Sequence, residues 1–417
     1  METREVPLSE LPFEFKAERW KGALEHRLLP WISYPYEWSF GMLRDAALLQ
    51  LELLHEALEA GFSLKDASPY NIQWLGVQPC FIDVGSFEPW KEGDVWVGYR
   101  QFCQLFLFPL WLRAYKDFPF QGLLRSNLQG ISPAEIIALM SWRDRLRPGV
   151  MIHGWLQARM IRRFAHTHRD VQGELRSTGF KREMIQANVA RLRRQVERLR
   201  WRAGGSPWAD YAEECSYAEQ ERREKEGFVD GVLERRRWRS VWDLGCNTGA
   251  FSEIAARHAD LVVALDGDEL AIERFYQKLR QRGSGTIVPL VMDLSQPSPA
   301  LGWRGRERAA LDQRGQQSQG KPEAILCLAL VHHLAITASI PLAEILEWLR
   351  DLRGELIIEF PHREDPMVQT LLRPKIEPHD AYHRQSFESQ LEQRFEIAET
   401  KTLTGGTRTL YHARPRG

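Results

Sequence analysis

Residues 241–249 have the sequence VWDLGCNTG, and this stretch decides the fold of the chain. An apolar run ends in an acid, turns through two glycines and enters an amphipathic pattern at residues 250–254. A strand, a glycine-rich turn and a helix in this order suit a nucleotide-like ligand, because glycine lets a ligand approach the backbone and the first N–H groups of the helix face it. The dinucleotide pattern G-x-G-x-x-G would need glycine at position 247, where asparagine stands, so that pattern fails.

The spacing D-x-G-x-x-x-G resembles the first motif of the class I S-adenosylmethionine-dependent methyltransferases. The resemblance implies an α/β fold for the C-terminal part: a Rossmann-like, seven-stranded sheet with an antiparallel final hairpin. It also implies S-adenosyl-L-methionine as the cofactor. At this turn the cofactor would be held by Asp243, Gly245, Cys246, Asn247 and Gly249.

The stretch after the glycine turn predicts a second strand at residues 260–266. This strand ends in Asp266, which follows Gly249 by 17 residues, close to the interval of about 20 residues in such units. A carboxylate at this place can accept hydrogen bonds from both hydroxyls of a ribose, and its charge strengthens them. We therefore expect Asp266, with Gly267 beside it, to bind the ribose of the cofactor.

The remaining strands are predicted in the order that the methyltransferase resemblance requires. A third strand at residues 286–291 precedes Asp293 and Leu294, which by resemblance lie at the adenine. A fourth strand spans residues 324–330, and the resemblance places its end, with Ala329, beside the transferred methyl group. The last three strands of the sheet are predicted at residues 355–361, 395–402 and 407–413.

Candidate catalytic residues follow the fourth and fifth strands, because ligands of α/β sheets bind outside the carboxyl ends of the strands. His333 is the first choice for a general base, with His362 and Glu359 behind it. His332 is an alternative to His333, and either ring could instead cap a helix or bond the backbone. No Asn-Pro-Pro-Tyr-type signature follows the fourth strand, which disfavours methylation of an amino group on a base or on glutamine.

The N-terminal half has a second constellation, in residues 64–85. Asp66 is followed by Asn71 after five residues and by an Asp-x-Gly sequence at Asp83. The spacing resembles the catalytic and metal-binding loops of protein, aminoglycoside and choline kinases. The resemblance implies a mostly helical, kinase-C-lobe-like domain, with Asp66 at the catalytic position and Asn71 and Asp83 at the metal positions.

The sequence departs from the kinase pattern in several places. The segment before residue 43 is too short for a full N-lobe and has no glycine-rich loop to hold ATP phosphates. We therefore expect a scaffold or binding surface without metal and without phosphotransfer. The simpler alternative is ordinary turn chemistry, since Asp, Ser, Pro and Asn cluster in turns.

Between the two halves, apolar residues at residues 185–199 alternate with the spacing of a coiled-coil seam, and arginines cover the other faces. The arginines could bind nucleic acid, but a solvated helix face is favoured. The Gly-Gly-Ser-Pro sequence at 204–207 breaks the chain. Beyond it, by the methyltransferase resemblance, a lid over the cofactor would involve Trp208, Tyr211, Tyr217 and Lys225, with packing onto the sheet as the alternative.

Length and composition bound these interpretations. A chain of 417 residues predicts more than one domain, and the patterns place a kinase-C-lobe-like domain at 1–180, a helical connector at 181–205 and a methyltransferase domain at 206–417. The formal net charge is zero, which disfavours nucleic acid as a partner of the whole surface. Five scattered cysteines, no signal peptide and no stretch able to span a membrane predict a cytoplasmic protein.

These patterns together predict a methyltransferase with a small-molecule, carbohydrate or lipid acceptor. An RNA methyltransferase using the arginine-rich connector and a non-catalytic regulatory protein with a degenerate kinase-like domain remain alternatives. The layout also resembles a bacterial group that includes nodulation host-specificity methyltransferases, which fixes no acceptor. The sequence makes no prediction of the oligomeric state, and an insert at residues 302–321, poor in apolar residues, is expected to be a mobile surface loop.

Overall fold

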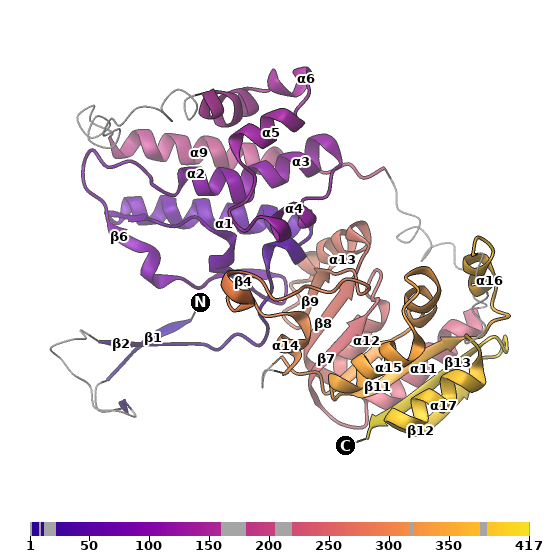
Figure 1. Cartoon of the computed structure of the whole chain (residues 1–417). Helices are drawn as coiled ribbons and strands as arrows, with labels where there is room; N and C mark the ends of the chain where they lie inside the picture. The colour runs from indigo at the N-terminus through magenta and orange to yellow at the C-terminus, as the bar shows by residue number, and fades with distance from the viewer. Residues whose placement is uncertain are drawn as a thin grey trace.

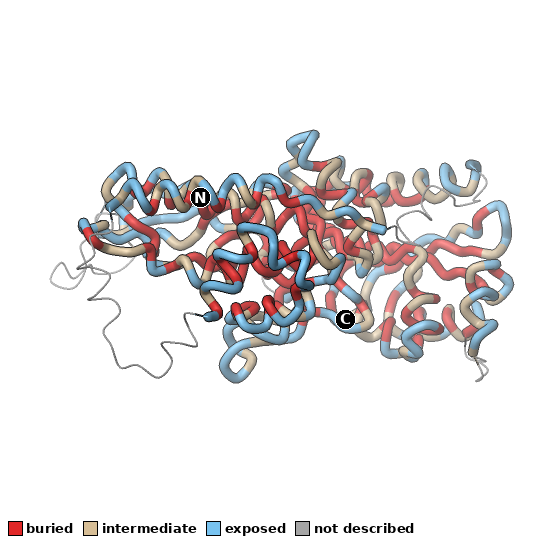
Figure 2. Tube along the Cα trace, turned by 90° about the horizontal axis from the view of Figure 1, so that it is seen from above, coloured by how far each residue is buried: buried red, intermediate tan, exposed pale blue. Residues whose placement is uncertain are grey.

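The computed structural model describes residues 2–7, 10–11, 22–159, 181–204, 219–316, 320–375 and 382–416. A mostly helical N-terminal half lies against an α/β C-terminal half (Figure 1). Buried residues run through both halves and across their junction (Figure 2), and they form one continuous apolar cluster. Trp208, Tyr211 and Tyr217, which were expected in the lid, lie outside the described residues.

The C-terminal half contains a seven-stranded sheet in the order β12-β13-β11-β10-β7-β8-β9. Five strands are parallel, while β13 is antiparallel to both β11 and β12. The predicted sheet with its antiparallel final hairpin is therefore confirmed. The bounds of the strands are β7 (Trp238–Leu244), β8 (Ala259–Asp266), β9 (Ile287–Val291), β10 (Ala324–Cys327), β11 (Glu355–Pro361), β12 (Phe395–Thr402) and β13 (Arg408–Pro415).

The direction in which the chain builds the sheet changes at β7. From β7 it proceeds through β8 to β9 on one side, and β10 then returns to pair with the other side of β7. Such a switch point leaves a crevice at the carboxyl ends of the strands, since the connections depart in opposite directions. The glycine turn that follows β7 lies at this crevice.

Helices pack on the sheet (Figure 1), and α13, α16 and α17 begin at residues whose side chains cap them. The N-cap of α13 is Asp268, whose Oδ1 accepts bonds from the N–H groups of Leu270 and Ala271, and Gly283 ends this helix with φ of +67°. The helices are α11 (Glu219–Leu233), α12 (Ala250–His258), α13 (Glu269–Arg282), α15 (Leu342–Asp351), α16 (Pro366–Leu372) and α17 (Arg384–Arg394).

The N-terminal half is built around α1 (Phe40–Glu59), and α9 (Arg182–Arg198) from the predicted connector packs along it. This packing explains the coiled-coil spacing of α9. Its buried residues are Ile185, Val189, Leu192 and Val196. A further helical stretch is continuous through α2 (Tyr99–Phe102), the π-helical η5 (Cys103–Leu107) and α3 (Phe108–Lys116).

Three small antiparallel pairs accompany these helices: β1 (Thr3–Val6) with β2 (Ala23–His26), β3 (Phe62–Leu64) with β6 (Phe87–Pro89), and β4 (Ile72–Leu75) with β5 (Gln78–Phe81).

The insert at residues 302–321 differs from its prediction as a mobile surface loop. It contains α14 (Leu311–Gln316), in which Leu311 and Arg314 are buried. Arg314 donates to both carboxylate oxygens of Glu37 and to the carbonyl of Ile32. The few apolar residues suggested an exposed loop, but the partner that buries this segment comes from the other end of the chain.

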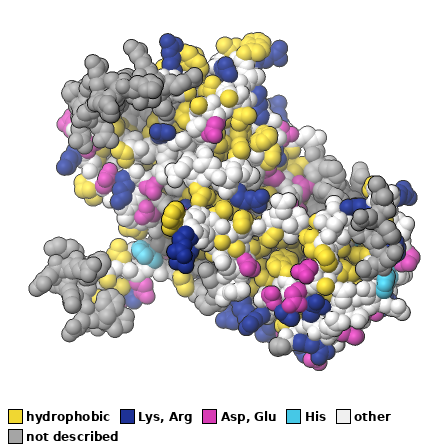
Figure 3. Space-filling view, viewed as in Figure 1, with side chains coloured by type: hydrophobic (Ala, Val, Ile, Leu, Met, Phe, Trp, Pro, Cys, Tyr) yellow, Lys and Arg dark blue, Asp and Glu magenta, His cyan; other side chains and the backbone are white. Residues whose placement is uncertain are grey.

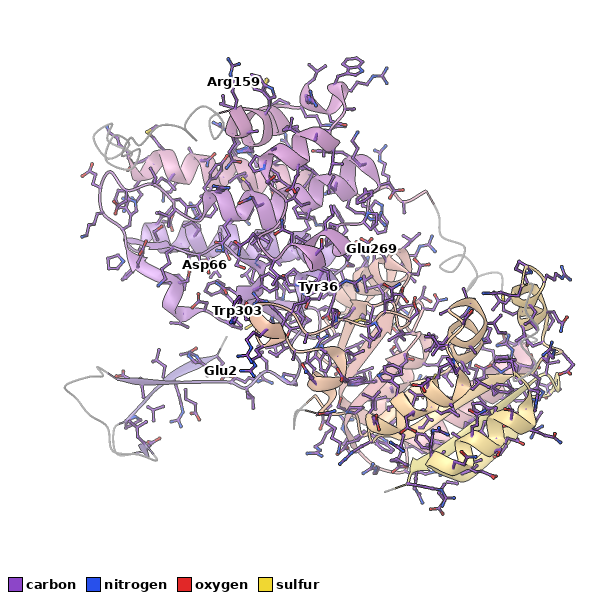
Figure 4. The ribbon with its side chains drawn as sticks, in the orientation of Figure 1. Glu2, Tyr36, Asp66, Arg159, Glu269 and Trp303 are labelled. Carbon is purple, nitrogen blue, oxygen red and sulfur yellow. The ribbon has the colours of Figure 1, made fainter. Side chains whose placement is uncertain are left out.

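The two halves share a tightly packed junction. The rings of Trp31 and Trp242 meet edge to face with their centroids 5.3 Å apart. Glu269 at the start of α13 is buried, which raises its pKa to about 7 although the Arg113 guanidinium at 2.9 Å opposes this shift. Both Tyr36 and Glu269 lie where the halves meet (Figure 4). The helical half therefore supports the β8–β9 side of the sheet.

A histidine inside the helical half predicts a pH dependence of stability. His153 in η6 (Val150–Leu156) is buried, and its Nδ1 lies 2.6 Å from the Tyr99 hydroxyl. Burial, followed by the charge of Arg191, lowers the pKa of His153 to about 4. The unfolded chain, with a histidine pKa of about 6.5, then binds more protons than the folded chain between these values. We expect the contribution of His153 to the free energy of unfolding, about 3 kcal/mol, to be lost as the pH falls from about 6.5 to about 4.

Urea unfolding at pH 7 and pH 4.5 measures this contribution. His153→Gln is expected to reduce the loss of stability between the two pH values, because glutamine has no proton to take up. The control is His26→Gln, which changes an exposed histidine. Equal pH dependence in the His153→Gln variant and the wild type would contradict the assignment.

Candidate active site

A cavity of about 580 Å³ opens at the carboxyl ends of the central strands. Volumes of this size are typical of small-molecule and cofactor sites. Of the ten residues predicted to bind the cofactor, nine line the cavity: Asp243, Gly245, Cys246, Asn247, Asp266, Gly267, Asp293, Leu294 and Ala329. The tenth, Gly249, has φ of +83°, and a Cβ atom there would lie 2.0 Å from the ring of Phe275. The backbone and the packing therefore require this glycine.

The glycine turn is fixed to the neighbouring strand. The N–H groups of Gly245 and Cys246 both donate to the carbonyl of Leu265 in β8, at 2.8 and 3.0 Å. Gly245 has φ of +79°, a conformation that a residue with a Cβ atom rarely adopts. These two bonds and this backbone conformation hold the turn against the end of β8.

Asp266 lies at the end of β8 and lines the cavity. Its two carboxylate oxygens each accept one backbone N–H, from Asn247 and from Asp268, both at 2.8 Å. Burial raises the pKa of Asp266, while these two backbone donors oppose the shift. Each carboxylate oxygen can accept further hydrogen bonds, so the group is oriented by the backbone and still suits the two hydroxyls of a ribose.

Asp243 at the end of β7 is also buried beside the cavity. Its Oδ2 accepts the hydroxyl of Ser252 at 2.5 Å, and burial raises its pKa to about 7 against the effect of this bond. Acidic groups therefore gather at this side of the cavity. A ligand with ribose hydroxyls, an ammonium and a sulfonium fits them, because it supplies donors and positive charge where the protein supplies acceptors and negative charge.

The chain after β10 turns sharply at Ala329. This residue has φ of +48°, a left-handed conformation that is unfavourable for residues other than glycine. The turn ends β10 at Cys327, three residues before the predicted end of the strand. Strained backbone of this kind is concentrated at functional sites, and here it lies in the cavity wall.

Two adjacent histidines follow this turn and line the cavity. The rings of His332 and His333 lie with their centroids 4.1 Å apart. Burial lowers the pKa of both side chains, with further effects of His333 and Arg408 on His332 and of Arg408 on His333, whose pKa falls to about 4. Both rings are therefore neutral near pH 7.

The other two catalytic candidates lie outside the cavity lining. Glu359 in β11 is fully buried and accepts bonds from Lys225 at 2.5 Å and Arg408 at 3.1 Å. Burial alone would raise the pKa of Glu359, but the two cations lower it. His362 lies with its Nε2 2.9 Å from the Thr409 hydroxyl. Glu359 acts here as the counter-ion of cavity-lining Lys225 and Arg408.

Sequence reasoning named Lys225 as a lid residue and missed Arg408. The available signal for Arg408 was a charged residue at the start of a strand that contains Leu410 and Tyr411. Its guanidinium also contacts Asp365, at 2.6 and 3.1 Å, so it links the ends of β11, α16 and β13.

The predicted kinase-like constellation lies in the helical half, apart from this cavity. Asn71 and Asp83 are adjacent, with the Asn71 amide donating to Asp83 Oδ2 at 3.1 Å. The N–H of Asp66 donates to the hydroxyl of Ser86, just beyond Asp83. Among the described residues, no group of three or more His, Cys, Asp or Glu side chains is arranged to hold a metal ion.

Three features together define the class of protein: the strand order of the sheet, the glycine turn after β7, and Asp266 as the last residue of β8. The C-terminal half has the fold of the class I S-adenosylmethionine-dependent methyltransferases, with its cavity at the switch point of the sheet.

Comparison with known proteins identifies the family. The chain is 35% identical over 391 residues to nodulation protein NoeA of Rhizobium meliloti (strain 1021), covering 93% of this chain and 81% of that protein. The chain therefore belongs to the family of NoeA. No protein-family model matches it.

Solved structures with similarity to the chain include N-methyltransferase NodS from Bradyrhizobium japonicum WM9 in complex with S-adenosyl-L-homocysteine. The two sequences are 14% identical. The match covers 50% of this chain and 98% of NodS, with a TM-score of 0.34. The PH0226 protein from Pyrococcus horikoshii OT3 is 15% identical over 48% of this chain and 92% of that protein, with the same TM-score of 0.34.

Proposed function

We propose that this protein transfers the methyl group of S-adenosyl-L-methionine to a small-molecule, carbohydrate or lipid acceptor. The observation that carries the proposal is the cavity at the switch point between β7 and β10, which is lined by the glycine turn and by Asp266, joined to each other through the Asn247 N–H. The donor supplies a methyl group on a sulfonium, whose leaving group departs without assistance. The protein must then bind the donor, orient the acceptor and take up any proton that the acceptor loses.

Binding of the donor is assigned to residues at the carboxyl ends of β7, β8 and β9. Asp266 accepts the ribose hydroxyls, Asp293 and Leu294 face the adenine, and Asp243 with the turn at Gly245 receives the positively charged end. These assignments place the methyl group toward the residues after β10, which include Ala329 and the histidine pair.

Proton uptake is assigned to His333. Its ring is neutral near pH 7, because burial and Arg408 lower its pKa to about 4, so it can accept a proton from the acceptor. The proton that arrives on His333 replaces the positive charge lost from the sulfonium, so that transfer leaves the net charge of the cavity unchanged. Although a ring of low pKa is a weak base, this balance of charge favours the transfer within a desolvated site.

Titration calorimetry of the full chain with S-adenosyl-L-methionine and S-adenosyl-L-homocysteine tests the proposal. We expect both compounds to bind with one site per chain. Absence of binding by the folded wild-type protein would refute the methyltransferase assignment and favour a non-catalytic role.

The histidine pair gives a prediction for turnover. We expect His333→Ala to lower the rate of methyl transfer by about 10²–10⁴-fold, the usual contribution of a positioned general base, while the affinity for the cofactor stays within a few-fold of the wild type. His362→Ala is expected to keep most of the rate, since His362 lies outside the cavity lining. The rate is measured as S-adenosyl-L-homocysteine released when extract of cells lacking the protein supplies the acceptor.

The reverse ranking, with the larger loss in His362→Ala, would move the proton acceptor to the end of β11. His332→Ala tests the neighbouring ring in the same assay. An equal loss in the His332 and His333 variants would assign proton uptake to the pair as a unit.

For the N-terminal half we propose a kinase-C-lobe-like scaffold without phosphotransfer. The proximity of Asn71 and Asp83 supports the likeness, as does the order of helix α1, hairpin and helix α2. The proposed domains remain 1–180, 181–205 and 206–417. In this arrangement the helical half supports the methyltransferase sheet through the junction at α13.

A further inference from the structure

One face of the helical half exposes large apolar side chains. The face is formed by α5 (Pro133–Leu139), α6 (Trp142–Arg145) and η6, which pack on one another. Trp142 is 68% exposed and Leu146 is 70% exposed. Exposed apolar groups of this size gathered in one place mark interaction sites on soluble proteins. The Trp142 face, as we name it, includes Leu139, Trp142, Leu146, Met151, Trp155 and Leu156.

The inner side of the same elements is a normal core. Ile136, Met140 and Val150 are buried, and the spacing of four residues between Met151 and Trp155 places both on the outer side of η6. The exposed side chains are therefore a second, separate apolar surface. It lies at the end of the helical half that points away from the methyltransferase sheet (Figure 1).

Arginines accompany the exposed tryptophans. The Arg143 guanidinium lies over the ring of Trp142 and the Arg159 guanidinium over the ring of Trp155, each 5.2 Å from the centroid. Hydrophobic and basic side chains are mixed at this end of the molecule (Figure 3), and Arg159 extends from it (Figure 4). These elements contain two acids: Glu135 accepts the Ser132 N–H at the start of α5, and Asp144 is paired with Lys116 at 2.5 Å. Arg143, Arg145, Arg147 and Arg159 outnumber them. The free charge of the face is therefore positive.

The positive charge and the apolar side chains together indicate which kind of partner binds the Trp142 face. A second copy of the chain, docked through the same face, would bring its arginines against these arginines, and like charges across an interface cost affinity. An anionic lipid surface instead carries negative charge that would attract these arginines. Tryptophan rings prefer the headgroup region of a bilayer, apolar side chains enter below it, and arginines bond lipid phosphates.

We infer that the Trp142 face docks on the surface of an anionic lipid bilayer. Trp142, Leu146 and Trp155 enter the boundary between headgroups and acyl chains, and the arginines contact phosphates. The contact is peripheral: in the parts of the chain that the structure describes, no helix has the length and apolarity to cross a bilayer. The inference does not depend on methyl transfer.

Co-sedimentation of the full chain with vesicles tests this inference. We expect vesicles of phosphatidylcholine with phosphatidylglycerol to bind the protein, and vesicles of phosphatidylcholine alone to bind it far less. Trp142→Ser combined with Leu146→Ser should weaken binding at least about tenfold, since two apolar side chains no longer leave water. Trp303→Ser is the matched control, because Trp303 is 79% exposed on a different part of the surface (Figure 4) and should leave binding unchanged.

A second variant tests the charge. Arg143→Glu with Arg159→Glu should abolish the preference for anionic vesicles, and added salt should weaken wild-type binding. All substitutions lie on exposed side chains, so thermal unfolding should be unchanged. The inference is overturned if the wild type does not bind anionic vesicles or if the Trp142 and Leu146 variant binds as well as the wild type. A dimer that this variant dissociates would also overturn it, in favour of self-association.

Discussion

Asp266→Ala is expected to lower the affinity of the protein for S-adenosyl-L-methionine by about 100-fold or more. The Asp266 carboxylate is assigned two charge-assisted hydrogen bonds from ribose hydroxyls, each contributing about 1.5–3 kcal/mol. The substitution also removes the acceptor of the Asn247 and Asp268 N–H groups, which loosens the glycine turn. Titration calorimetry measures the loss directly and needs no knowledge of the acceptor.

Two further variants separate recognition from folding. Asp260→Ala changes an exposed aspartate near the start of the same strand, β8, where its partner is Arg237, and should leave cofactor affinity unchanged. Asp266→Asn keeps the shape of the side chain but removes its charge and replaces one acceptor oxygen by a donor, so an intermediate or equal loss is expected. Wild-type affinity in a folded Asp266→Ala protein would remove Asp266 from the site.

Local patterns predicted the methyltransferase sheet well, because its parallel strands are mainly apolar runs that end in a polar or glycine-rich turn. The observed β8 ends at the predicted Asp266, and β11 has the predicted bounds. The nine predicted residues that line the cavity could also be found from the sequence, because the residues that follow adjacent parallel strands must meet at one edge. Sequence spacing is sufficient for such contacts.

Contacts between segments far apart in the chain could not be predicted from local sequence patterns. Arg408 and Lys225 reach Glu359 from two other elements, and neither position has a neighbour in sequence that indicates the contact. The insert around α14 was predicted as a loop because its composition is polar, yet Glu37 and Arg314 are separated by 277 residues and bury each other's charge. A buried charge pair has no local pattern, since each member alone looks like a surface residue.

The ion pair of Glu37 and Arg314 gives the largest expected effect on stability. Glu37 is fully buried and Arg314 is 2% exposed, and the two guanidinium nitrogens lie 2.9 and 2.5 Å from the two carboxylate oxygens. Glu37→Gln leaves the guanidinium without its counter-ion inside the protein. Removal of one member of a buried pair costs about 3–5 kcal/mol, so the free energy of unfolding in urea should fall by that amount.

The pair also tests whether the two halves unfold together. Glu37 precedes α1 of the helical half and Arg314 belongs to the insert between β9 and β10, so their contact crosses the junction. If the halves are one cooperative unit, Glu37→Gln should shift a single transition, seen equally by fluorescence and circular dichroism. Two separate transitions would show that the junction is weaker than its buried contacts imply.

Glu25→Gln, which breaks an exposed pair with Arg4, should change stability by less than about 1 kcal/mol. A double-mutant cycle with Arg314→Met then isolates the energy of the pair, because the double variant no longer contains an unpaired buried charge.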